Sequence, residues 1–238
     1  MGAYQIIDPA VASALEWWAD AGVDVLVEDE VRDWFAAPAA KVAATAPAER
    51  PAGTLPDTIE AFAAWRTGPD APEAGWSGVS LAATGPAQAD VMVLVDCPER
   101  DDGDAGALLS GAAGRLFDRM LAAIGLSRDV VHLAAVCARR PAAGRVPREI
   151  EDRLGEVSRH LVELAAPKRL LLLGEATSRA ILAADRASSR GSLRPFNHKN
   201  GQTQVVASHH PRLLLERPAL KAESWRDLQL LMGSGHDA

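Results

Sequence analysis

The sequence predicts an α/β fold: a three-layer α/β/α sandwich around a central four-stranded, mostly parallel sheet. Two observations predict it. Four short apolar runs, each of the length of one strand, alternate with segments whose apolar residues have helical spacing. The runs are almost continuously apolar, which is typical of parallel strands covered by helices on both faces. The expected strands are residues 91–95, 130–136, 169–174 and 203–207.

Four helices are expected to alternate with these strands. The first, residues 108–124, has a helically spaced apolar face and is closed by a glycine at position 125. The second, residues 147–165, begins with a proline, which suits the first turn of a helix. Residues 175–184 and 219–232 follow the third and fourth strands and complete the alternation.

The N-terminal part differs in composition from the rest. Residues 1–40 are predicted to be a helical segment with a heavy load of tryptophan, and residues 41–56 to be an Ala/Pro-rich linker. The main domain is then residues 57–238. We expect the helices to dock on the main domain, with a protein partner on the tryptophans as the alternative.

Composition narrows the class of protein. Hydrophobic residues make up 48% of the chain, no apolar run approaches the length of a membrane span, and the N-terminus lacks a signal-peptide pattern, so a cytoplasmic monomer is expected. The net charge of −7 argues against a generic nucleic-acid binder. However, residues 1–127 hold 7 Lys and Arg against 20 Asp and Glu, whereas residues 128–238 hold 18 against 12, so an anionic ligand can still bind one face.

Candidate functional residues follow the predicted strands. The carboxyl ends of parallel strands share one rim, which is where ligands bind in such sheets. Here that rim receives Asp96, Arg139, Arg140, His209 and His210. A carboxylate facing a histidine suits activation of water or stabilisation of a cationic transition state. The alternative role for Asp96 is a helix or turn cap.

Two other groups of residues near the first strand are expected to have ordinary roles. Cys97 is expected to be a packed residue, since nothing local lowers its pKa. Asp101, Asp102 and Asp104 are expected to be solvated, and no metal site is expected among them because no histidine lies nearby.

In their order along the chain, three motifs resemble the uracil-DNA glycosylase superfamily, and most of all its family-4 branch. Residues 95–99, Val-Asp-Cys-Pro-Glu, are similar to the family's Gly-Glu-Ala-Pro-Gly. Residues 140–147 are similar to its Arg-Pro-Pro-Gly-Asn-Arg-x-Pro loop, and residues 210–215 to its His-Pro-x-x-Leu-Leu loop. The resemblance runs from about Val91 to Met232.

The resemblance implies an enzyme that rotates a base out of DNA and hydrolyses the N-glycosidic bond of uracil or a related damaged base. By position, Asp96 and His210 are then the catalytic residues. The implied substrate pocket consists of Cys97, Pro98, Leu109, Ala135 and His209. The implied DNA contacts are Arg139, Arg140, Arg145, Arg212, Leu213 and Leu214.

This sequence also departs from the family pattern. The iron–sulfur cluster of family 4 needs four cysteines, whereas this chain has two and carries Arg139 at one of the four positions, so no cofactor is expected. Leu109 stands where the family has a stacking phenylalanine, and Ala135 where it has the asparagine that reads uracil. Val95 and Glu99 replace the two motif glycines.

These changes predict weak or relaxed base specificity. A catalytically inactive DNA-binding or protein-interaction member of the same fold therefore remains an alternative. A more distant alternative is a small-molecule enzyme that uses Asp96 and the two histidines.

Overall fold

The computed structural model describes residues 54–184 and 189–233. The predicted helical segment, residues 1–40, lies outside this part of the chain. Of the predicted linker, residues 41–56, the part up to residue 53 also lies outside it.

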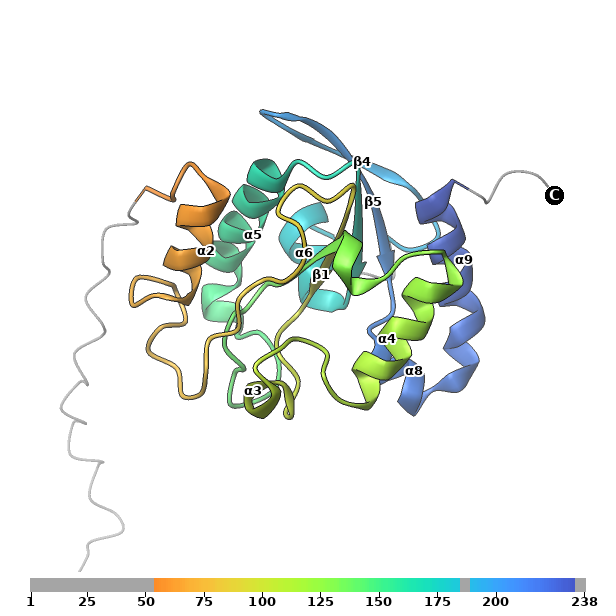
Figure 1. Ribbon diagram of the computed structural model, residues 1–238, viewed down its shortest axis with the longest axis horizontal. Coiled ribbons are helices and arrows are strands. Elements are labelled where there is room, and N and C mark those ends of the chain that lie inside the picture. Colours follow the sequence, from red (N-terminus) through yellow and green to blue (C-terminus); the bar gives the residue numbers. More distant parts are fainter. Residues whose placement is uncertain (1–53, 185–188, 234–238) are drawn as a thin grey trace, which may run out of the picture. The chain divides into compact units, whose positions relative to one another are not determined.

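The core of the described unit is a five-stranded sheet with the strand order β2-β1-β3-β5-β4 (Figure 1). The strands are β1 (Val91–Val95), β2 (Val131–Ala135), β3 (Arg169–Leu173), β4 (Arg194–His198) and β5 (Gly201–Ser208). Four of them, β2, β1, β3 and β5, run parallel, which confirms the predicted sheet.

The fifth strand, β4, is absent from the sequence prediction. It pairs antiparallel with β5 and lies at the edge of the sheet. Its residues alternate between half-buried and exposed, and they include Pro195 and Asn197, so it lacks the continuous apolar run that identified the other strands. A proline is tolerated there because an edge strand has one row of unpaired amides.

Helices cover both faces of the sheet, as the apolar strands predict (Figure 1). One layer is formed by α2 (Ile59–Thr67), α5 (Glu151–Ala165) and α6 (Glu175–Leu182), and it packs on strand residues such as Leu94 and Leu172. The other layer is formed by α4 (Ala112–Ala123), α8 (Pro211–Glu216) and α9 (Lys221–Met232), and it packs on Val93 and Leu171. Successive strand residues thus point to opposite layers.

The described residues also form four short elements: α3 (Asp102–Ala105) and the 3₁₀ turns η1 (Arg128–Val130), η2 (Arg148–Ile150) and η3 (Pro218–Leu220). Among the described helices, none has both the length and the apolar content needed to cross a membrane.

The register of the sheet places the carboxyl ends of its four parallel strands side by side, and the predicted functional segments follow these ends. Val95 lies beside both Ala135 and Leu173, and Leu173 lies beside Ser208. The residues that follow these strand ends, Asp96 after β1 and His209-His210 after β5, therefore emerge at the same rim of the sheet.

Candidate active site

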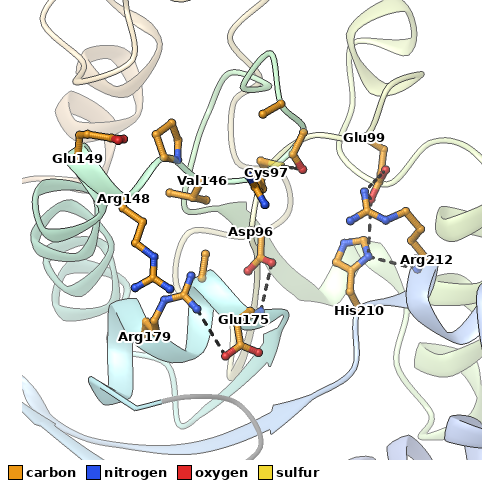
Figure 2. A pocket seen from close by; sticks show the side chains of 15 residues that line it. Asp96, Cys97, Glu99, Val146, Arg148, Glu149, Glu175, Arg179, His210 and Arg212 are labelled. Atoms are coloured by element: carbon orange, nitrogen blue, oxygen red, sulfur yellow. Dashed lines mark hydrogen bonds and ion pairs between the residues drawn. The ribbon is translucent and has the colours of Figure 1, made fainter.

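A cavity of about 610 Å³ opens at this rim and brings together residues from four segments of the chain (Figure 2). The segment after β1 provides Asp96, Cys97 and Glu99. The segment before α5 provides residues 143–149, and the start of α6 provides Glu175, Ala176 and Arg179. The segment after β5 provides His210 and, at the start of α8, Arg212. Of the predicted catalytic, pocket and DNA-contacting residues, Asp96, Cys97, Arg145, His210 and Arg212 line this cavity.

Asp96 is held at the N-terminus of α6. Its carboxylate accepts hydrogen bonds from the backbone N–H groups of Glu175 (3.2 Å) and Thr177 (2.9 Å). Gly174 makes this approach possible, because a Cβ at that position would overlap the carboxylate. Asp96 thus has the alternative role of a helix cap. The helix that it caps is α6, which follows β3, whereas Asp96 itself follows β1. Its carboxylate still lines the wall of the cavity.

The carboxyl group of Asp96 has an unusual acidity. Burial raises its pKa to about 6, against the opposing effect of the two backbone hydrogen bonds and of the Arg179 guanidinium. At neutral pH the group is therefore mostly ionised, and a small fall in pH protonates it.

His210 lies on the other side of the cavity and is 8% exposed. Its Nδ1 accepts a hydrogen bond from the backbone N–H of Arg212 at 3.2 Å. Burial, together with the nearby Arg212 guanidinium, lowers the pKa of His210 to about 4. The ring is therefore neutral at physiological pH, and because Nδ1 is an acceptor, the proton resides on Nε2, which is a hydrogen-bond donor.

Glu99 and Arg212 form an ion pair beside His210 (Figure 2). Nη1 of Arg212 lies 3.1 Å and 3.0 Å from the two carboxylate oxygens of Glu99. Nδ1 of His210 is 3.7 Å from the same carboxylate, and Nη1 of Arg140 is 3.9 Å away. Glu99 stands at the position of a glycine in the family motif that residues 95–99 resemble.

The opposite side of the cavity is rich in arginine. Arg179 pairs with Glu151 on α5 and with Glu175 on its own helix. Arg145 and Arg148 are exposed, and neither has an ion-pair partner within the described part of the chain. These two guanidinium groups are available to an anionic ligand.

Asp102 is a buried residue that holds the segment carrying Glu99 in place, which corrects the expectation that Asp102 is solvated. It is 1% exposed. Its carboxylate accepts hydrogen bonds from the backbone N–H groups of Glu99, Leu109 and Ser110 and from the Ser110 hydroxyl. These bonds outweigh the effect of burial and lower its pKa. Asp102 thereby fixes the segment after β1 to the segment before α4.

Four residues assigned by resemblance to the substrate pocket lie away from the cavity. Leu109 is 1% exposed and packs in the apolar core, with an unusual backbone φ of 54°. Ala135 borders a separate small space next to α2, and Pro98 a shallow depression beside Arg140. His209 is buried against α9, where its Nε2 lies 3.0 Å from Glu223.

Several predicted DNA contacts are also engaged within the protein. Arg139 donates to the Ser80 hydroxyl and to the carbonyl oxygens of Ala74 and Trp76, so its guanidinium fastens that loop to the end of β2. Arg140 donates to the carbonyl oxygen of Pro98. Leu214 is 1% exposed and belongs to the core, because it points inward from α8. Leu213 is half-buried, and the exposed leucine of this triplet is Leu215.

The residues do not fit an iron–sulfur cluster. Burial raises the pKa of Cys97 to about 12 and also raises that of Cys137, which disfavours the thiolates that bind iron. The guanidinium of Arg139 fills one of the positions that family 4 gives to a cysteine ligand, and it is tied up by the three hydrogen bonds just described. No group of three or more metal-binding side chains occurs among the described residues.

Sequence reasoning missed Glu149, Glu175 and Arg179 as residues of the cavity. The signal for the last two was available: Gly174 is the single residue between β3 and α6, so α6 begins at the rim where the other candidates lie. A helix N-terminus in that place is a preferred site for a negative group, and here it receives Asp96.

Comparison with known proteins agrees with this architecture. Residues 82–229 match the family model of the uracil DNA glycosylase superfamily. The chain is 28% identical over 155 residues to a type-4 uracil-DNA glycosylase of Pyrobaculum aerophilum, covering 62% of this chain and 79% of that protein. It is 28% identical over 150 residues to a type-4 uracil-DNA glycosylase of Archaeoglobus fulgidus, covering 60% and 75%.

A type-4 uracil-DNA glycosylase of Sulfurisphaera tokodaii is 29% identical over 144 residues, covering 56% of this chain and 64% of that protein. The matched region contains the whole sheet and every residue that lines the cavity. The chain therefore belongs to the uracil-DNA glycosylase superfamily and resembles its type-4 members.

Proposed function

We propose that this protein is a DNA glycosylase that hydrolyses the N-glycosidic bond of uracil, or of a related damaged base, after the base has rotated out of the DNA stack. The observation that carries the proposal is the placement of Asp96 and neutral His210 on the walls of one cavity. Membership in the superfamily and the names of the type-4 relatives support DNA as the substrate.

The two groups suit the two charges that develop as the bond breaks. The sugar acquires cationic character, which the ionised carboxylate of Asp96 stabilises, and the same carboxylate orients the attacking water. Both oxygens of Asp96 already accept one backbone N–H each, and each retains acceptor capacity toward the cavity. The departing base becomes anionic, and Nε2–H of His210 donates a hydrogen bond to it.

Neutral histidine suits this second role. Its proton is held on Nε2 by the Arg212 amide at Nδ1, so the donor is in place before substrate binds and requires no protonation step. Leu215, which is 43% exposed beside this loop, is positioned to fill the space left in the DNA by the rotated base.

The test is release of base from single- and double-stranded oligonucleotides that contain one uracil, read as alkali-labile breaks with enzyme in excess over DNA. Wild-type protein should cleave, and Asp96→Ala and His210→Ala should each lose on the order of a hundredfold or more in single-turnover rate. Arg153→Gln, at a half-buried position on α5 that does not line the cavity, serves as the matched purification control and should retain the rate.

Equal cleavage by all preparations would reveal a contaminating glycosylase. Absence of cleavage by wild type, with DNA binding retained, would favour the second candidate function, a DNA-binding member without catalysis. That candidate is supported by the replacement of the stacking phenylalanine and the uracil-reading asparagine by Leu109 and Ala135, neither of which lines the cavity.

A further inference from the structure

At the cavity, the carboxylate of Glu99 forms an ion pair with the guanidinium group of Arg212, which lies in the first turn of α8. Arg212 is the half-exposed partner, with 48% of its side chain accessible, whereas 17% of the Glu99 side chain is accessible. The two residues are 113 positions apart in sequence, so the contact joins the segment after β1 to α8. Figure 2 shows the pair directly above His210.

Glu99 is held in place independently of Arg212. Its backbone N–H donates to the buried carboxylate of Asp102 at 2.8 Å. The acidic side chain is therefore presented to Arg212 from a fixed backbone. Arg212 lies on a short surface helix and is also 4.0 Å from Glu216.

A carboxylate and a phosphate offer a guanidinium similar pairs of oxygen acceptors. A DNA phosphate that approaches Nη1 of Arg212 consequently competes there with Glu99. We propose that Glu99 is a specificity-determining residue that imitates a phosphate, competing with the DNA backbone for Arg212 and weakening binding to intact DNA. This inference rests on the proposed function, because it takes DNA as the ligand.

A different arrangement has the opposite consequence. If Glu99 only orients Arg212 toward a phosphate, the pair acts as a positioning contact, and its removal must weaken binding to DNA. The direction of the change in affinity therefore separates a competitor from a positioning residue.

The experiment measures the affinity for an undamaged oligonucleotide by fluorescence anisotropy, because phosphate contacts do not require a lesion. At 50 mM salt, Glu99→Gln should bind about two- to fivefold more tightly than wild type, the range expected for an exposed ion pair. Glu99→Gly, which restores the glycine of the family motif, is the second variant and should change affinity in the same direction. Glu60→Gln on α2 makes the same change in net charge far from Arg212 and should bind like wild type.

The decisive arm repeats the substitution in an Arg212→Gln background, where it should give no tightening. Equal tightening with and without Arg212 would mean that Glu99 repels DNA generally, and this would overturn the proposal. Unchanged or weaker binding by Glu99→Gln in the protein that retains Arg212 would overturn it as well. Base release is measured on the same preparations. If wild type releases uracil but Glu99→Gln binds DNA no more tightly than wild type, this inference alone is overturned. If the protein neither binds DNA nor releases the base, the proposed function is overturned as well.

Discussion

At the scale of single residues, the site places a charged and a neutral titratable side chain on one cavity at neutral pH. Burial disfavours the charged form of both side chains. The charged form of Asp96 is the deprotonated one and that of His210 the protonated one, so burial raises the pKa of Asp96 and lowers the pKa of His210. Backbone hydrogen bonds from the start of α6 limit the rise for Asp96. The outcome at pH 7 is a carboxylate facing a neutral imidazole, the pairing that the proposed reaction requires.

This pairing predicts a specific pH dependence. The single-turnover rate of base release should fall as the pH drops through about 6, because Asp96 becomes protonated. His210 adds no change in that interval, since its pKa is about 4. Arg179→Gln should move the fall in rate to higher pH, because the Arg179 charge lowers the pKa of Asp96.

The measurement is the rate between pH 4.5 and pH 8 at constant ionic strength. Arg153→Gln on α5 removes an equal charge from an exposed pair and should leave the profile unchanged. A flat profile from pH 5 to pH 7 would contradict the assignment of the carboxylate to Asp96.

At the scale of elements, the sequence predicted what depends on local pattern. Each of the four parallel strands contains a short, mostly apolar run that the sequence makes visible. The rim at their carboxyl ends follows from parallel topology, which is why Asp96 and His210 could be brought together without coordinates. The edge strand β4 was missed because its burial depends on a single neighbour, β5. Which leucine of the triplet 213–215 enters the core depends on the phase of α8, and the sequence gives no signal for it.

Asp102 shows a second limit of local pattern. An acidic residue in an acidic run looks solvated, and its four hydrogen bonds come from residues 99, 109 and 110, which only the fold brings together. Asp102→Asn should lower the free energy of unfolding by about 3 kcal/mol, because an amide NH₂ would face buried N–H donors. Asp104→Asn, at an exposed position on the same short helix, should change it little.

Urea denaturation at pH 7 measures this difference. Because the pKa of Asp102 is lowered in the folded state, its contribution is present above the unfolded pKa and is lost as the pH falls through the folded one. The gap between wild type and Asp102→Asn should accordingly narrow in acid. Equal urea midpoints for the two Asn variants at pH 7 would show that the segment does not depend on this carboxylate.

At the scale of the whole molecule, a chain of net charge −7 must bind a polyanion through a local group of cations. The cavity supplies that group on one side, in Arg145 and Arg148, while Arg212 on the other side is paired with Glu99. The remainder of the acidic molecule repels DNA over distances that salt screens. Binding should therefore be weak and confined to this rim.

The last prediction concerns the salt dependence of that binding. If Arg145 and Arg148 each neutralise one phosphate, the logarithm of the affinity for duplex DNA should fall with the logarithm of salt concentration with a slope of about −1.8, or roughly twelvefold between 50 and 200 mM. Arg145→Gln and Arg148→Gln should each reduce the slope by about 0.9. Arg119→Gln, on the exposed face of α4, removes the same charge elsewhere and should shift the affinity without changing the slope. Equal slopes for all four proteins would place the DNA on another face of the molecule.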